Sequence, residues 1–236
     1  EIRPRDWSSD VCSSDLDLAQ LDGALANDLK DLEQRVESIR QKVNLSKPSG
    51  VVPDITSALK LLRQVQAKTS NEQVRFLLKQ KEADFQEAAR LSAGLVLDVV
   101  ASDDTVVPGQ EFDLTVSVIN GGPFEFTGVK SSTEIPAGWD IVAQGSTGSL
   151  LPGQRLDQKF KVKVSATPDF TQPYWLRTAR KGGRFVWPST LTTLQPIDLP
   201  LLPTSVELDL QGTTIGMSHA AEFRRIDRML GEQREL

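Results

Sequence analysis

The clearest hydrophobic pattern in the chain is an alternation of apolar and polar residues that occurs twice, each time directly after a Pro-Gly-Gln sequence. The first copy has Pro108-Gly109 before residues 111–120, and the second has Pro152-Gly153 before residues 155–166. A Pro-Gly pair suits the centre of a type II turn, because proline fixes the first φ and glycine accepts a positive φ at the second. The alternation predicts two antiparallel strands of a sandwich, each with one buried face. The apolar faces are Phe112, Leu114, Val116 and Val118 in the first copy, and Phe160, Val162 and Val164 in the second.

Ahead of these strands, apolar residues recur at intervals of three and four, which is the period of a helix. The pattern predicts helices over residues 18–43, 55–68 and 70–93. Asp54 is the expected cap of the second helix, and Ser70 with Gln73 resembles a capping box for the third. Short links favour a helical hairpin or three-helix bundle. The spacing in residues 18–43 also allows a coiled coil with a partner chain, although packing within the chain is the simpler expectation.

Gly94 marks the change from the helical period to the strand period, and residues 95–100 alternate. Weaker strand patterns occur at residues 124–130 and 139–143. Together with the two Pro-Gly strands, they predict an immunoglobulin-like β-sandwich over residues 94–168.

The remainder of the chain has less regular patterns. Residues 169–187 are predicted to form an extended arm with a hairpin that turns at Gly182-Gly183, followed by a proline-rich linker. Residues 205–210 and 213–216 have strand patterns on either side of a turn. The apolar residues of the tail 222–236 fit a helix: Phe223, Ile226 and Leu230.

The expected fold class is therefore α+β with several domains. Residues 17–93 form a helical connector, and residues 94–168 form the immunoglobulin-like sandwich. Residues 169–236 contain the aromatic arm, extra β-hairpins and the start of a further β domain, which we expect to be truncated.

Residues 1–16 need separate treatment, because residues 6–16 (DWSSDVCSSDL) match the in-frame translation of a sequencing-library adapter. We treat this segment as foreign and exclude it from the fold. Cys12, the one cysteine of the chain, lies within it, so the remaining sequence offers no thiol chemistry. We also expect the natural protein to continue upstream, with a catalytic domain or signal peptide that this sequence lacks.

The net charge of −5 gives no reason to expect nucleic acid as a partner, since nucleic-acid binding usually needs a basic face. No apolar run approaches the roughly 20 residues that span a bilayer.

The residues needed for hydrolytic chemistry are scarce. His219 is the one histidine, whereas a hydrolytic zinc ion needs about three protein ligands, usually including histidine or cysteine. Ser-His-Asp and Cys-His pairs face the same shortage. Asp103-Asp104 is expected in a surface loop, and no glycine-rich phosphate-binding motif occurs. We therefore predict no catalytic residue, metal site or cofactor in this chain.

One stretch combines aromatic and basic residues. Aromatic rings stack on sugar faces and arginines bind anionic groups, so the stretch is a candidate carbohydrate platform. Burial of the same rings against a neighbouring domain is the alternative, and we favour it because Pro173 stiffens the arm. The candidate residues are Tyr174, Trp175, Arg177, Arg184 and Trp187, with Phe170, Arg180, Lys181 and Phe185 nearby.

Three motifs together resemble the middle of the long bacterial PIG-L (LmbE-like) deacetylases. They are LVLDVVASDDTVVPGQEFDLTVSVINGG at 95–122, LLPGQRLDQKFKVKV at 150–164 and FTQPYWLRTARKGGRFVWP at 170–188. The sandwich is similar to the NEW-type domain associated with alpha-galactosidases. The resemblance implies an upstream Rossmann-like domain that binds zinc through an AHPDD-type motif and removes acetyl groups from N-acetylglucosamine-type substrates. None of those zinc-binding residues is present here, and family members of this type are often exported.

The leading hypothesis is thus a non-catalytic accessory fragment of a PIG-L deacetylase. Its helical stripe and aromatic arm would pack in cis against the missing catalytic domain, which would hold the zinc. The alternatives are a carbohydrate or cell-wall binding module and a coiled-coil adaptor.

Overall fold

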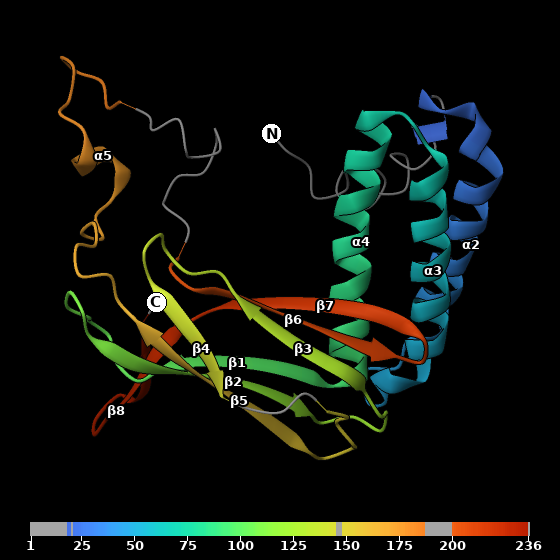
Figure 1. Cartoon of the computed structure of the whole chain (residues 1–236). Helices are drawn as coiled ribbons and strands as arrows, with labels where there is room; N and C mark the ends of the chain where they lie inside the picture. The colour runs from blue at the N-terminus through green and yellow to red at the C-terminus, as the bar shows by residue number, and fades with distance from the viewer. Residues whose placement is uncertain (1–17, 20, 145–147, 187–199, 236) are drawn as a thin grey trace.

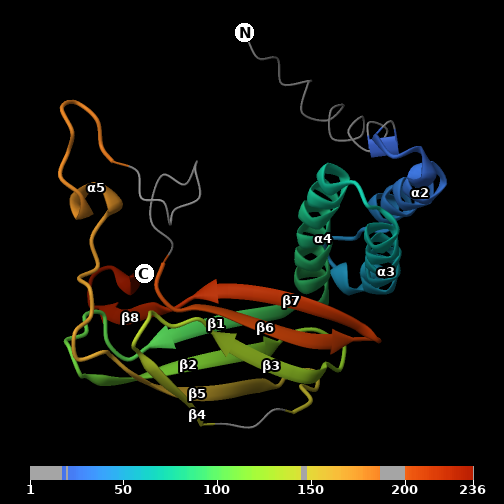
Figure 2. The ribbon, with the colours of Figure 1, turned by 45° about the horizontal axis from the view of Figure 1, so that its top comes forward.

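The structure is a computed structural model, and it describes residues 18, 19, 21–144, 148–186 and 200–235. A helical bundle stands at one end of a layered β structure, and a long arm rises at the other end (Figures 1 and 2). The helical elements are η1 (Gly23–Leu25), α2 (Ala26–Lys42), η2 (Pro48–Val51), α3 (Val52–Lys68) and α4 (Glu72–Ala93). The combination of a helical N-terminal part with β-sheets confirms the α+β class.

The middle of the apolar stripe predicted in residues 18–43 is buried inside the bundle, whereas Leu21 and Val43 are 44% and 47% exposed. Leu25, Leu29 and Leu32 belong to one cluster with Leu59 and Leu62 of α3 and with Val74 and Leu78 of α4. The stripe therefore packs on helices of its own chain, as the simpler expectation had it. Within the described chain, its buried residues contribute to the interior of the bundle rather than to a surface.

The helix starts differ from the predictions. Residues 18, 19 and 21 are helical as predicted, but η1 interrupts the helix, and α2 begins at Ala26. The second begins at Val52, since Pro53 suits a first turn, and Asp54 there pairs with Lys42 at 2.9 Å instead of capping. Asn71, not Ser70, caps α4, because its side-chain oxygen accepts hydrogen bonds from the backbone N–H groups of Gln73 and Val74.

Nine strands form two sheets in the described part of the chain. The larger sheet has the order β4-β5-β2-β1-β8-β9, and the smaller has the order β3-β6-β7. The strands are β1 (Leu95–Ala101), β2 (Glu111–Asn120), β3 (Thr127–Thr133), β4 (Asp140–Gln144), β5 (Arg155–Lys163), β6 (Pro203–Leu210), β7 (Thr213–Ala220), β8 (Glu222–Asp227) and β9 (Gly231–Glu235). The predicted apolar faces of β2 and β5 are buried, which confirms the two-residue period.

The two Pro-Gly turns have the same geometry. In each, the glycine has a positive φ (77° at Gly109, 75° at Gly153), and the glutamine N–H bonds back to the carbonyl three residues earlier at 3.1 Å. The glutamine side-chain oxygen of Gln110 accepts from Val107 N–H at 2.9 Å, and that of Gln154 accepts from Leu151 N–H at 3.0 Å. Each turn also closes the far end of the other strand: Gly109 N–H bonds to Ser165 O, and Gly153 N–H bonds to Asn120 O.

Because the two turns are equivalent, Gly109→Ala and Gly153→Ala should destabilise the protein by similar amounts, about 1 kcal/mol each. A Cβ atom would meet nothing within 4 Å at either site, so the cost is the positive φ alone. Urea unfolding of the two variants and of Gly50→Ala, which has neither a positive φ nor a close neighbour, measures this. A difference above about 1 kcal/mol between the two turns would contradict their equivalence.

The C-terminal strands complete the sandwich rather than starting another domain. β6 pairs with β3 from Thr133↔Thr204 to Thr127↔Asp209, and β7 pairs with β6 along its whole length. Val206, Leu208 and Ile215 lie in the same core cluster as Leu114 and Phe160. The sheets therefore continue past the boundary expected at residue 168, because residues of β6 and β7 belong to the same core.

The tail 222–235 is a β-hairpin, not the helix that its apolar spacing suggested. β8 joins β1 in parallel through two residue pairs, Val100↔Glu222 and Ala101↔Phe223. Arg224 reinforces this short pairing with hydrogen bonds of 2.6 and 2.7 Å to the Asp98 carboxylate. Ile226 and Leu230 remain exposed, so the apolar residues whose spacing fits a helix do not form a buried face.

The bundle has a hydrophobic cluster of its own, and the helices also contribute residues to the cluster that fills the sandwich. Val52 and Ile55 of α3 and Ala89 and Ala93 of α4 lie in the cluster that fills the sandwich. α4 runs directly into β1 through Gly94, whose φ of 75° is the left-handed conformation of a helix C-cap. The helical segment is thus joined to the sandwich by packing as well as by the continuous chain.

The junction depends on Gly122, since a Cβ atom there would lie 1.9 Å from the Ala93 carbonyl oxygen. We expect Gly122→Ala to lower the free energy of unfolding by about 2–3 kcal/mol, because the clash is with backbone and α4 would have to move. Differential scanning calorimetry with Gly183→Ala as the control tests this, since a Cβ at Gly183 meets no atom within 4 Å. Equal stability of the two variants would show that the helix–sheet junction is loose.

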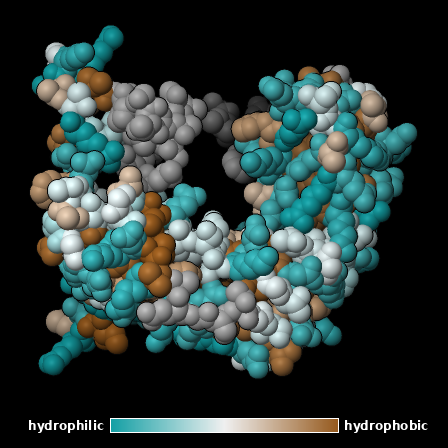
Figure 3. Space-filling view, in the orientation of Figure 1, coloured by the Kyte–Doolittle hydropathy of each residue, from teal (hydrophilic) through white to brown (hydrophobic). Residues whose placement is uncertain are grey.

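The arm, residues 169–186 of the described chain, contains the short helix α5 (Tyr174–Arg177). The predicted hairpin is confirmed, because Lys181 and Arg184 exchange backbone hydrogen bonds of 3.1 and 3.2 Å around Gly182-Gly183. Within the described residues, no helix combines the length and apolar character needed to cross a bilayer. Figure 3 shows hydrophobic surface gathered where the arm meets the sheets.

Candidate functional site

The structure brings together some of the predicted site residues. Tyr174 and Trp175 meet edge to face on α5, with ring centroids 5.1 Å apart. Trp175 and Arg177 line a cleft, whereas Arg184 is exposed in the hairpin and lines no described cleft. Trp187 lies outside the described residues.

The cleft beside α5, which we call the aromatic cleft, has a volume of about 590 Å³ and lies between the arm and one end of the sandwich. Four segments far apart in the sequence contribute its aromatic rings, which are Phe112, Trp139, Trp175 and Phe223. Its charged lining residues are Asp103, Asp104, Arg177 and Glu235. Its size and mostly apolar lining, with a few polar groups at the edge, are typical of small-molecule sites.

Turn chemistry places two of these rings. Phe112 is the first buried residue of β2 after the Pro108-Gly109 turn, and Trp139 follows another turn with Gly138 at a φ of 78°. The Trp139 N–H donates to Pro136 O at 3.1 Å, which closes that turn. The two rings meet edge to face, 6.1 Å apart at 86°, so Trp139 is held against the core while part of its ring stays exposed.

The sequence did not indicate that Trp139, Phe223 and the 103–104 loop would line the same cleft. Trp139 was expected only as part of a weak strand, and Phe223 as part of a helix. No local sequence pattern places these two residues at one site, because β8 reaches the cleft by pairing with β1.

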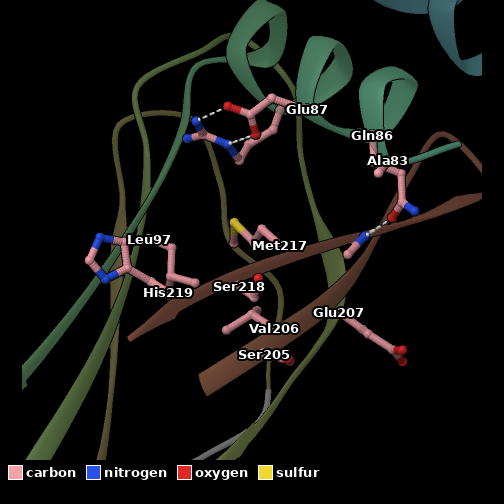
Figure 4. A pocket seen from close by; sticks show the side chains of 12 residues that line it. Ala83, Gln86, Glu87, Leu97, Ser205, Val206, Glu207, Met217, Ser218 and His219 are labelled. Atoms are coloured by element: carbon pink, nitrogen blue, oxygen red, sulfur yellow. Dashed lines mark hydrogen bonds and ion pairs between the residues drawn. The ribbon is translucent and has the colours of Figure 1, made fainter. Parts of the chain in front are cut away.

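A second cleft, of about 570 Å³, lies between α4 and the strands β6 and β7 (Figure 4). It contains His219, the single histidine of the chain. His219 Nδ1 lies 2.7 Å from the Ala220 carbonyl oxygen, and Nε2 lies 3.7 Å from a Glu222 carboxylate oxygen. Within the described residues, no group of three or more His, Cys, Asp or Glu side chains is arranged to hold a metal ion.

Glu87 and Arg90 form the charged wall of this second cleft. Arg90 donates two hydrogen bonds of 2.6 and 2.7 Å to the Glu87 carboxylate and a third, of 2.9 Å, to the Leu95 carbonyl. The hydrogen bonds from Arg90 hold the pKa of Glu87 below its ordinary value. Glu87 is therefore ionised at neutral pH and poorly suited to act as a general acid.

The lowered pKa of Glu87 predicts the pH dependence of its contribution. A carboxylate with a depressed folded-state pKa stabilises the protein above its unfolded value, 4.5, and loses that contribution as pH falls through the folded value. The stability difference between wild type and Glu87→Gln, less than about 1 kcal/mol at this exposed pair, should be complete at pH 7 and vanish in acid. Urea unfolding at several pH values tests this, with the exposed Glu125→Gln as control. A stability difference that stays the same at every pH would contradict it.

Comparison with protein families gives one match, at residues 106–178, to the NPCBM-associated, NEW3 domain of alpha-galactosidase. Residues 106–178 form a NEW3 domain. The match spans β2 to β5 and α5, and it includes Phe112, Trp139 and Trp175 of the aromatic cleft. It does not include β1 or the strands β6 to β9, which complete both sheets around the NEW3 domain. The match bears on the NEW-type part of the resemblance and leaves the PIG-L part as a proposal.

No curated protein matches the chain. Among solved structures, the GAE domain of GGA2p from Saccharomyces cerevisiae aligns with 8% identity and a TM-score of 0.33, covering 54% of this chain and 86% of that one. The secreted serine protease VesC from Vibrio cholerae aligns with 10% identity and a TM-score of 0.33, covering 63% and 27%. The FixG-related protein from Vibrio parahaemolyticus aligns with 14% identity and a TM-score of 0.24, covering 53% and 93%. Such scores are too low to support a conclusion about fold or function.

Proposed function

We propose that this chain is a non-catalytic accessory part of a carbohydrate-active enzyme, in which it acts as a scaffold for the catalytic domain. The observation that carries the proposal is the NEW3 domain, which is named for its association with alpha-galactosidase. We further propose that the enzyme is an exported PIG-L family zinc deacetylase of N-acetylglucosamine-type substrates. Its zinc ion would be held by the catalytic domain and not by this chain.

The shared core of helices and sheets supports a scaffold role. Arg63 of α3 donates a hydrogen bond of 2.8 Å to the Thr214 carbonyl, and Gln86 of α4 accepts one of 2.6 Å from the Gly216 N–H. These contacts join the bundle to β7 as well as to β1. A body held in this way can fix the position of a domain that binds to it.

The arm is the proposed contact with the catalytic domain. Phe170 is 89% exposed and Leu176 is 64% exposed, so both offer apolar surface that a neighbouring domain can bury. The proposal assigns this role to the arm alone, because the helical stripe is buried within the bundle.

Two measurements test the proposed function. Purified chain incubated with zinc and an N-acetylglucosaminide should release no acetate, and the reading frame upstream of this segment should encode an AHPDD-type zinc domain. Release of acetate by the chain alone would overturn the accessory role. An upstream frame that encodes an unrelated domain would overturn the PIG-L assignment.

Binding to the separately expressed upstream domain tests the contact surface. The double variant Phe170→Ser/Leu176→Ser should weaken binding at least tenfold, because it removes two exposed apolar side chains. Leu45→Ser is the matched control, since Leu45 is 92% exposed in the loop between α2 and η2. Equal binding by both variants would place the contact elsewhere.

A further inference from the structure

The aromatic cleft has features that a scaffold role does not require. Trp139 and Trp175 both keep part of their rings exposed, and they approach the cleft from different elements, Trp139 from the turn before β4 and Trp175 from α5. The two rings face one cleft instead of packing against each other. Their partial exposure leaves flat apolar faces available to a ligand.

The polar groups at the edge of the cleft carry an excess of negative charge. Asp103 and Asp104 lie in the loop between β1 and β2, and neither carboxylate has an ion pair within the described chain. The Ser102 hydroxyl donates to Asp103 at 2.9 Å and orients that side chain. Glu235 is already paired with Arg225 at 3.0 Å, and Arg177 donates to the Gln172 carbonyl at 3.1 Å.

The exposed indole faces and the unpaired carboxylates indicate the chemical class of the ligand. Sugars present C–H faces that pack on indole rings, together with hydroxyl groups that bind carboxylates. The acidic loop disfavours uronic acids and other anionic sugars, because two unpaired carboxylates repel a third. It favours a sugar that carries an ammonium group, which would form a charge-assisted hydrogen bond with Asp103 or Asp104.

We propose that the aromatic cleft binds an amino-sugar oligosaccharide, with pyranose rings against Trp139 and Trp175 and an ammonium group at the Asp103-Asp104 loop. The proposal rests on the carbohydrate association in the proposed function and adds a site, a ligand class and an orientation to it. Neither the residues of the second cleft nor Arg184 take part.

Separate elements hold the aromatic rings of the cleft in place at the end of the sandwich. Trp139 is fixed by its edge-to-face contact with Phe112, and Phe223 is fixed by the pairing of β8 with β1. Of the four rings, Trp175 is the one that belongs to the arm, so its removal should change binding without loss of the fold. Tyr174 contacts Trp175 and positions it without lining the cleft.

Isothermal titration calorimetry of the full chain with a glucosamine hexamer, an N-acetylglucosamine hexamer and a galacturonate hexamer tests the proposal. The glucosamine hexamer should bind best and the galacturonate hexamer should give no heat. Trp175→Ala should weaken binding about tenfold, and Asp103→Asn/Asp104→Asn should remove the preference for the free amine. Phe76→Ala, an exposed aromatic residue on α4, is the control and should bind like wild type.

The outcomes separate this proposal from the accessory role. Absence of binding to all three hexamers, or tighter binding of galacturonate, would overturn the aromatic cleft as an amino-sugar site. An equal loss of affinity in Phe76→Ala would do the same, because it would place the ligand elsewhere. Circular dichroism confirms that each variant is folded. The accessory role stands or falls on acetate release and the upstream reading frame.

Discussion

A chain that ends at residue 178, the last residue of the NEW3 match, will not fold into the sandwich. It lacks β6 and β7, so β3 loses its only described partner strand and the apolar face of β2 and β5 loses its cover. A sandwich needs both sheets, since a single half-covered sheet exposes its apolar side to water. We expect this truncated chain to be collapsed and to bind a dye that reports exposed apolar surface. Its NMR spectrum should lack dispersed amide resonances.

The matched control ends at residue 221 and removes only β8 and β9. It keeps both layers of the sandwich, so it should fold cooperatively with a lower melting temperature. Point variants test the same contact without removing strands. Leu208→Ala or Ile215→Ala should lower the free energy of unfolding by about 2–5 kcal/mol, because each side chain is almost completely buried. Ile226→Ala, at a site that is 86% exposed, should cost less than about 0.5 kcal/mol. A folded, cooperative 178-residue chain would show that the NEW3 domain is independent of the C-terminal strands.

Asn120→Ala should be among the most damaging single substitutions, at about 3–5 kcal/mol. The Asn120 amide is completely buried, and its nitrogen donates to Phe124 O at 2.7 Å and Leu150 O at 3.2 Å. Its oxygen accepts from Gly122 N–H at 3.0 Å. Alanine would leave Phe124 O and Gly122 N–H unpaired beside the helix–sheet junction, while Leu150 O would keep its bond from Phe126 N–H. Each unpaired buried group costs about 1–3 kcal/mol.

Asn71→Ala is the matched control for this substitution. Its side chain also accepts backbone hydrogen bonds, at the N-terminus of α4, but it lies near the surface, where water can replace it. It should cost about 1 kcal/mol. Chemical denaturation of both variants measures the two costs, and an Asn120→Ala cost at or below that of Asn71→Ala would contradict the buried network.

The elements that sequence reasoning found are those fixed by local rules. The Pro-Gly turns, the alternation of β2 and β5 and the Gly94 helix end depend on residues within a few positions of each other. The order of strands in the sheets depends on pairing across long separations, and the 205–210 pattern gives no sign that its partner is β3. For the same reason the tail was ambiguous: its apolar spacing fits a helix, whereas pairing with β9 and β1 makes it a strand.

The candidate site was predicted in part. Trp175 and Arg177 belong to a contiguous aromatic and basic stretch, which composition alone reveals. Trp139 and Phe223 reach the same cleft from segments 84 positions apart in the numbering, through a turn at Gly138 and the β1–β8 pairing. Only the fold brings these rings to one place.

We expect the helices, the NEW3 domain and the C-terminal strands to unfold as one cooperative body. Native-state hydrogen exchange tests it most directly, because it measures the opening free energy of each backbone amide. Core amides of β7, such as Ile215, should exchange only through the same global opening as core amides of α4 and β2. Exchange of the β6–β7 amides at a distinctly lower free energy, with α4 and β2 still protected, would contradict it.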